Sequence, residues 1–278
     1  MAFTSRLVVV CAFALWTALC AGLTVATAGS TDCFEGNGTK PDDMIAACTS
    51  LIEHGRLSRE EKSHAFNSRG AAHKVKGELD LAVADFDEAI RLDSENVFAI
   101  SNRGAAWSAM GDFDRAITAY SAAIKIEPAF VPSIFNRGRI WHWKGDYPKA
   151  IDDFSQVLRL QKGHAGALNG RCRDRAIIGQ DLKAALSDCN VALSNSRNMA
   201  EYFQTRGFVR YKMQDYAKAL ADLDKAVALD PKAADSWYIR GLAKRHAGRE
   251  AEGRADVEAG LRLDPNVARQ YAEYGVQP

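Results

Sequence analysis

A pair formed by an arginine and a small residue recurs along this chain at a nearly constant interval. Successive small residues are separated by 34, 34, 34, 35 and 34 positions. They are Gly70, Gly104, Gly138, Cys172, Gly207 and Gly241, preceded by Arg69, Arg103, Arg137, Arg171, Arg206 and Arg240. A fixed period of this length indicates a solenoid, because each unit is too small to bury its own apolar face. The pattern predicts stacked repeats that share one core.

The apolar positions inside each repeat have the spacing of two amphipathic helices. A large apolar residue lies four positions before each marker, namely Phe66, Ile100, Ile134, Leu168, Phe203 and Trp237. Further small and packing residues follow at offsets of four and three, which places them on one helical face. Glycines between the two halves mark a turn: Gly77, Gly111, Gly145, Gly179 and Gly248. We therefore expect twelve antiparallel helices within residues 63–267.

This order of large apolar, small, turn-glycine, alanine, aromatic and proline positions resembles the tetratricopeptide repeat (TPR) family. The stretch 97–130 carries the most complete set, with Gly104, Trp107, Gly111, Ala116, Tyr120, Ala123 and Pro128. The resemblance covers six repeats, at 63–96, 97–130, 131–164, 165–199, 200–233 and 234–267. Repeat four departs most, with Cys172 in the glycine position and an extra residue near Gln180. The resemblance implies an all-α fold, a right-handed α-solenoid of antiparallel helix pairs.

Both ends of the array have interpretable segments. Residues 29–62 are expected to form a degenerate half-repeat, since "PDDMIAACTSLI" at 41–52 has the pattern of a second helix. Ser58 and Glu61 have the spacing of a capping box that starts the first full repeat. A short capping helix is expected from Val267 to about Tyr274, within a C-terminal segment that ends with residues 268–278. No linker interrupts the period, which favours one solenoid domain over two globular domains.

The first 28 residues are typical of a secretory signal peptide. Arg6 precedes an uncharged stretch at 7–25, and Ala26-Thr27-Ala28 offers small residues at a cleavage site. The stretch is long for a signal peptide, so an uncleaved membrane anchor is the alternative. We expect an exported protein, periplasmic or secreted, which contacts a membrane only if this segment is retained. Without residues 1–28 the chain has 35 basic and 35 acidic side chains, which argues against nucleic-acid binding.

Four cysteines remain after the predicted cleavage site. Cys172 and Cys189 stand in the glycine and aromatic positions of repeat four, which pack against each other in TPR proteins. Cys33 and Cys48 are separated by 15 residues, close to the 17 that separate the first pair, and Cys48 has the same position as Cys189. In an oxidising compartment this predicts the disulfides Cys33–Cys48 and Cys172–Cys189. Buried, unpaired cysteines are the alternative.

An aspartate accompanies the recurring arginine in five of the six repeats. It lies 16 residues after the arginine, or 17 in repeat four, at Asp85, Asp153, Asp188, Asp222 and Asp256. A charge pair in a fixed position of each repeat predicts a ladder of ion pairs between helices rather than a set of ligands. We expect exposed pairs, each contributing about 0–1 kcal/mol.

No sequence motif of catalysis or metal binding is present. The six histidines form no HxxxH or HExxH spacing, and no His/Cys cluster has zinc-finger spacing. The chain also lacks GxSxG, a phosphate-binding loop and a dinucleotide fingerprint. We therefore expect a protein that is not an enzyme and has no cofactor and no metal.

The TPR resemblance implies that the inner faces of the first helices line a peptide-binding groove. Fifteen side chains occupy these positions: Lys74, Phe98, Asn102, Phe135, Asn136, Arg139, His142, Trp143, Asn169, Arg173, Phe208, Tyr211, Lys212, Tyr238 and Arg245. The acidic residues among them are fewer, Glu201 and Asp235. The face is thus basic and aromatic. Asn102 and Asn136 resemble asparagines that bind a peptide backbone, although asparagine before Arg-Gly can equally serve packing.

Two functions are compatible with these observations. The first is a non-enzymatic exported scaffold or adaptor that binds a protein or peptide segment in its groove. Arg139, Arg173, Lys212 and Arg245 would then attract an acidic or aromatic segment. The alternative is a structural or assembly component of the cell envelope, tethered through residues 7–25, with partners on the convex face or at the ends.

Overall fold

The computed structural model describes residues 32–34 and 40–276, and this part of the chain is all α-helical. The predicted signal peptide, residues 1–28, lies outside the described residues, as do residues 277–278. No described helix combines the length and apolarity that a membrane span requires. The helices group into two compact units, the first ending at Ile126 and the second beginning at Glu127. The uninterrupted period predicted one array, and the two units are described separately below.

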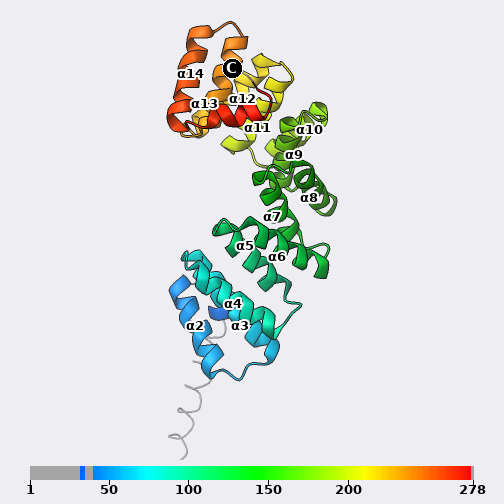
Figure 1. The fold of residues 1–278 in the computed structure, drawn as a ribbon, viewed down its shortest axis with the longest axis vertical. Helices are drawn as coiled ribbons and strands as arrows, with labels where there is room; N and C mark the ends of the chain where they lie inside the picture. The colour runs from blue at the N-terminus through cyan, green and yellow to red at the C-terminus, as the bar shows by residue number, and fades with distance from the viewer. Residues whose placement is uncertain (1–31, 35–39, 277–278) are drawn as a thin grey trace, which may run out of the picture. The chain divides into compact units, whose positions relative to one another are not determined.

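The first unit contains five helices, joined by short connections (Figure 1). They are α2 (Pro41–His54), α3 (Arg59–Val75), α4 (Leu79–Leu92), α5 (Val97–Ala109) and α6 (Phe113–Ile126). Each helix packs against the next, and the first helices α3 and α5 also contact each other. The capping box is present: Ser58 Oγ accepts from the Glu61 backbone, and the Glu61 carboxylate accepts from the Ser58 backbone. The box starts α3 at Arg59, four residues before the predicted repeat boundary.

The second unit repeats the same arrangement and ends in a short helix. Its helices are α7 (Val131–Trp143), α8 (Tyr147–Leu160), α9 (Ala165–Ile177), α10 (Leu182–Asn195), α11 (Ala200–Lys212), α12 (Tyr216–Leu229), α13 (Ala234–His246), α14 (Glu250–Leu263) and α15 (Val267–Glu273). The first helices α7, α9, α11 and α13 contact one another in sequence and form one layer. The predicted twelve helices α3–α14 and the terminal helix α15 are therefore confirmed.

The turns between paired helices explain most of the spaced glycines. Gly77, Gly111, Gly145, Gly179 and Gly248 have φ angles between 69° and 81°, a region that other residues adopt at a cost. Repeat five has no glycine here, and Gln214 takes the same conformation with φ of 62°. The sequence pattern missed this turn because packing of α11 on α12 imposes the backbone conformation on a residue that does not favour it.

The marker glycines let paired helices approach closely. A Cβ atom added at Gly70 would lie 2.8 Å from the Phe86 ring, and one added at Gly104 would lie 3.0 Å from the Tyr120 ring. In repeat four the two positions are covalently joined instead, by the disulfide Cys172–Cys189 with a Cα–Cα distance of 5.6 Å. The predicted pairing of Cys33 with Cys48 is also present, with a Cα–Cα distance of 4.9 Å.

The predicted ion-pair ladder is present in all five repeats that have both residues. Each arginine directs Nε and Nη2 at the two carboxylate oxygens of its aspartate, as Arg206 does with Asp222 at 2.9 and 2.7 Å. The expectation of exposed pairs was wrong: Asp85, Asp153, Asp188, Asp222 and Asp256 are all buried. The two helices of each pair cover the carboxylate, so each rung is a buried pair within the helix packing.

The same arginines also reach back to the preceding repeat. Arg171 Nη1 donates to Ser155 Oγ at 3.2 Å, and Arg240 Nη1 lies 3.0 Å from an Asp224 oxygen. Each of these arginines therefore connects three helices: its own, the second helix of its repeat and the second helix before it. Repeat two has Ala119 where the other repeats have the aspartate, and its Arg103 pairs with Asp87 on α4.

Candidate functional site

A pocket of about 340 Å³ lies among α7, α8, α9 and α11 of the second unit. Six of the predicted groove residues line it together: Phe135, Arg139, His142, Trp143, Asn169 and Arg173. The remaining lining residues are Phe154, Gly166, Gly170, Glu201 and Tyr202. The first helices thus bring the central part of the predicted groove into one cavity.

The α7 wall is aromatic and cationic. Phe135, Arg139 and Trp143 follow one another at intervals of four, so they share one helical face. The Arg139 guanidinium carbon lies 4.8 Å from the centroid of the Trp143 ring, and Trp143 is 50% exposed. A half-exposed tryptophan under an arginine offers a flat apolar surface with a cation at its edge, which favours contact with a partner.

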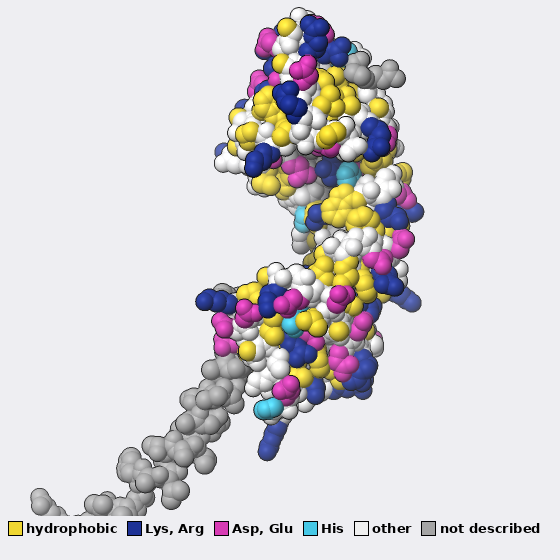
Figure 2. Space-filling view, turned by 60° about the vertical axis from the view of Figure 1, so that its left-hand side comes forward, with side chains coloured by type: hydrophobic (Ala, Val, Ile, Leu, Met, Phe, Trp, Pro, Cys, Tyr) yellow, Lys and Arg dark blue, Asp and Glu magenta, His cyan; other side chains and the backbone are white. Residues whose placement is uncertain are grey.

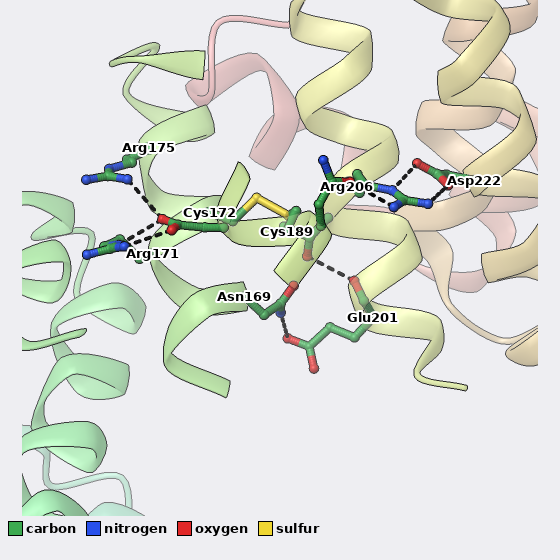
Figure 3. Close-up of a disulfide and its surroundings, with 11 residues drawn as sticks. Asn169, Arg171, Cys172, Arg175, Cys189, Glu201, Arg206 and Asp222 are labelled. Atoms are coloured by element: carbon green, nitrogen blue, oxygen red, sulfur yellow. Dashed lines mark hydrogen bonds and ion pairs between the residues drawn. A yellow bond between two sulfur atoms is a disulfide. The ribbon is translucent and has the colours of Figure 1, made fainter. Parts of the chain in front are cut away.

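The α9 wall contributes polar groups at closely spaced positions. Asn169 Nδ2 donates to Glu201 Oε1 at 3.1 Å, and Arg173 Nη1 lies 3.3 Å from the same oxygen. Figure 3 shows Asn169 and Glu201 on one side of the Cys172–Cys189 disulfide and Arg171 and Arg175 on the other. The disulfide therefore joins α9 to α10 directly beside the polar wall of the pocket.

Two glycines that the sequence analysis did not single out shape the pocket. A Cβ atom added at Gly166 would lie 2.9 Å from the Phe135 ring, and one added at Gly170 would lie 2.6 Å from the Phe154 ring. These glycines let both rings approach α9 and form the apolar base of the pocket. Both lie outside the 34-residue marker series, so the period gave no signal for them.

Several buried polar atoms in this region have no hydrogen-bond partner within the described part of the chain. They include Asn169 Oδ1 and Arg173 Nε. Buried polar groups are normally paired, so an acceptor and a donor left open on one wall indicate capacity for a ligand or water. His142, in contrast, is held in place, since its Nδ1 lies 2.5 Å from Oδ1 of the fully buried Asp174.

The C-terminal part of the predicted groove is covered by α15. Phe208 and Tyr238 pack against Tyr271, with ring centroids 5.4 and 5.6 Å apart, and both are buried. Lys212 Nζ donates to the Tyr274 carbonyl at 2.8 Å. Phe208, Lys212 and Tyr238 were therefore predicted incorrectly as open groove residues. The apolar side of α15, formed by Val267 and Tyr271, covers this part of the face.

Tyr211 and Arg245 also lie outside the pocket. Tyr211 is buried, with its ring packed against Tyr216 and His246, and Arg245 pairs with Glu250 at 3.2 Å. Both side chains are thus engaged by neighbouring helices of their own unit.

The predicted groove residues of the first unit do not share this pocket. Phe98 is 59% exposed and lines a separate hollow, and Asn102 Nδ2 donates to Asn67 Oδ1 at 3.0 Å. Burial lowers the pKa of Lys74. Asn136 is half-buried on α7 in the second unit and does not line the pocket described above.

The charges around the pocket are mixed, with the cations on its walls. Burial raises the pKa of Asp235, an effect that the nearby Arg173 opposes. Arg173 thus faces carboxylates at Glu201 and Asp235. On the face shown in Figure 2, basic and acidic side chains are interspersed, without a broad region of one sign. The basic character that the sequence predicted is confined to the pocket itself.

Comparisons with known proteins agree with this architecture. A family model described as "Tetratricopeptide repeat" matches residues 106–168 and 206–268. A TPR protein from Parabacteroides merdae has a similar structure, with a TM-score of 0.64 and 15% identity over 92% of this chain and 100% of that one. A search of curated protein sequences finds no significant match.

Two further solved structures have the same fold. PilF of Pseudomonas aeruginosa gives a TM-score of 0.64 at 15% identity, over 77% of this chain and 99% of that one. YrrB, described as a TPR protein with an unusual peptide-binding site, gives a TM-score of 0.54 at 18% identity, over 69% of this chain and 98% of that one. At these identities the similarity shows the fold alone.

Proposed function

Because the chain has the fold of a TPR solenoid and resembles that family in sequence, we propose that it is a non-enzymatic scaffold that binds a segment of a partner protein. The binding site in this proposal is the pocket among α7, α9 and α11. The peptide-binding description of YrrB supports a protein ligand in general terms.

One observation carries the proposal: a half-exposed aromatic surface lies beside open hydrogen-bonding groups in the same pocket. Trp143 and Arg139 supply the kind of side chains that dominate protein interfaces. Asn169 Oδ1 and Arg173 Nε supply an acceptor and a donor without partners among the described residues. A peptide segment offers apolar side chains, N–H donors and carbonyl acceptors, which match these groups.

Replacing Trp143 by alanine should weaken partner binding by about 2 kcal/mol or more, roughly 30-fold in Kd, mainly through faster dissociation. Arg139→Glu should slow association and make it less sensitive to salt. Both variants should retain wild-type helicity. The measurement is surface plasmon resonance with the partner identified by cross-linking to this protein in its own compartment.

Trp141→Ala is the matched control for Trp143→Ala. Trp141 lies on the same helix and also carries a cation over its ring, Lys149 Nζ at 4.4 Å, but it does not line the pocket. We expect Trp141→Ala to bind normally. If both pocket variants bind as wild type and convex-face variants do not, the pocket is not the site, and the assembly-component function takes its place.

We also propose that the protein is exported, to the periplasm or beyond the cell. Two disulfides are compatible with an oxidising compartment, and the uncharged stretch at 7–25 precedes a cleavage-site pattern. The expected mature protein begins at Gly29. N-terminal sequencing of material from the periplasmic or secreted fraction checks this, and a retained stretch 7–25 would favour the membrane-tethered alternative.

A further inference from the structure

Glu201 is the single carboxylate that lines the candidate pocket, within the described part of the chain. It stands in the first turn of α11, and its side chain is 52% exposed. Its Oε1 accepts from Asn169 Nδ2 at 3.1 Å and lies 3.3 Å from Arg173 Nη1. Asn169 and Arg173 are one helical turn apart on α9, so both donors converge on one half-exposed oxygen.

This convergence leaves the cationic groups of the pocket only partly satisfied. Asn169 is 2% exposed, and its Oδ1 and the Arg173 Nε have no partner in the described regions. Arg139, on the opposite wall, forms no ion pair with any residue that the structure describes, and its guanidinium lies over Trp143. The pocket therefore combines one cation that is loosely neutralised by Glu201 with a second that is not neutralised by an adjacent carboxylate.

We propose that Glu201 is an internal competitor, and that the bound segment places an aspartate or glutamate carboxylate on Asn169 and Arg173 in its stead. This inference rests on the proposed function and names the chemistry of the partner at that site. A half-exposed ion pair is weak, so Glu201 leaves at small cost and regains hydration. An incoming carboxylate can use both oxygens on the guanidinium and also lies near the Arg139 charge.

The exchange makes Glu201 a specificity-determining residue. A segment without a carboxylate cannot replace Glu201 on Arg173, and a segment with one must compete with it. The prediction is that Glu201→Gln strengthens binding of an acidic probe while leaving a neutral probe unaffected. Glutamine keeps the length of the side chain and removes only its charge.

The test uses two blocked peptides, acetyl-Gly-Phe-Glu-Gly-amide and its glutamine analogue. Their Kd values are measured by NMR titration of the full mature protein, following the Trp143 indole N–H and the Asn169 side-chain amide. For Glu201→Gln we expect the glutamate peptide to bind about three- to fivefold tighter than to wild type. The glutamine peptide should bind the two proteins equally.

Glu250→Gln is the matched control. Glu250 also stands in the first turn of a helix, is 52% exposed and lies 3.2 Å from an arginine, Arg245, yet it does not line the pocket. This variant should bind both peptides as wild type does. The control separates a local exchange at Asn169 and Arg173 from a general change in net charge or in helix capping.

Unchanged or weaker binding of the glutamate peptide to Glu201→Gln would overturn the inference, and so would failure of this peptide to bind either protein. Preferential binding of a lysine analogue that is lost in Glu201→Gln would overturn it in favour of a basic ligand. In each case the proposed function is judged separately, since it fails only if Trp143→Ala and Arg139→Glu bind the cross-linked partner normally.

Discussion

Replacing Asp222 by alanine should lower the free energy of unfolding by about 3–5 kcal/mol. Asp222 is 2% exposed and accepts from Arg206 Nε and Nη2 at 2.9 and 2.7 Å and from Arg210 Nη1 at 2.7 Å. Removing it leaves two largely buried guanidinium groups without their carboxylate, and Arg210 Nε already lacks a partner. Urea unfolding followed by circular dichroism measures the loss.

Asp224→Ala provides the comparison on the same helix. Asp224 also pairs with a ladder arginine, Arg240 at 3.0 Å, but its side chain is 59% exposed. Its loss should cost about 0–1 kcal/mol. If the two variants lose the same small amount, burial of the ladder carboxylates has no energetic consequence. A variant with apolar residues at Asp222, Arg206 and Arg210 together should recover much of the stability, because no unpaired charge remains.

Removing the Cys172–Cys189 disulfide should destabilise the second unit by about 3 kcal/mol, since the bridge closes a loop in the unfolded chain. The two cysteines are separated by 17 residues, and both are fully buried. We expect Cys172→Ser/Cys189→Ser to unfold at lower urea concentration and to match the wild type treated with a reductant. An unfolding midpoint that is insensitive to both changes would show that the bridge adds no stability.

The neighbouring repeat suggests a second variant that separates the covalent bond from simple filling of space. In repeat three the same two positions hold Gly138 and Phe154, with the ring 3.1 Å from a Cβ built on the glycine. Cys172→Gly/Cys189→Phe transfers this pair to repeat four. It should recover part of the stability lost in the serine variant, because the aromatic ring restores apolar packing between α9 and α10.

Regular features of the chain were predictable from sequence because they depend on contacts that every repeat makes in the same way. The helix pairs, the glycine turns, the Arg–Asp pairs and the pairing of Cys172 with Cys189 all follow from positions within a 34-residue unit. The capping box at Ser58 and the short C-terminal helix follow from local sequence signals. Each of these features involves residues within one repeat or at a helix end, so the period was sufficient.

The open part of the binding face was decided by tertiary structure alone. The sequence gives Phe208 and Tyr238 the same first-helix positions as Phe135 and Arg139, and nothing in the period distinguishes them. Docking of α15 buries the first two, because Tyr271 packs against both rings.

Burial of the ladder carboxylates and the contact of Glu201 with Asn169 and Arg173 likewise depend on how closely successive helices pack. A one-dimensional repeat specifies which side chains face inward. The three-dimensional packing of the helices, and of α15 upon them, determines which of those side chains remain available to a partner, since solvent access depends on neighbours distant in sequence.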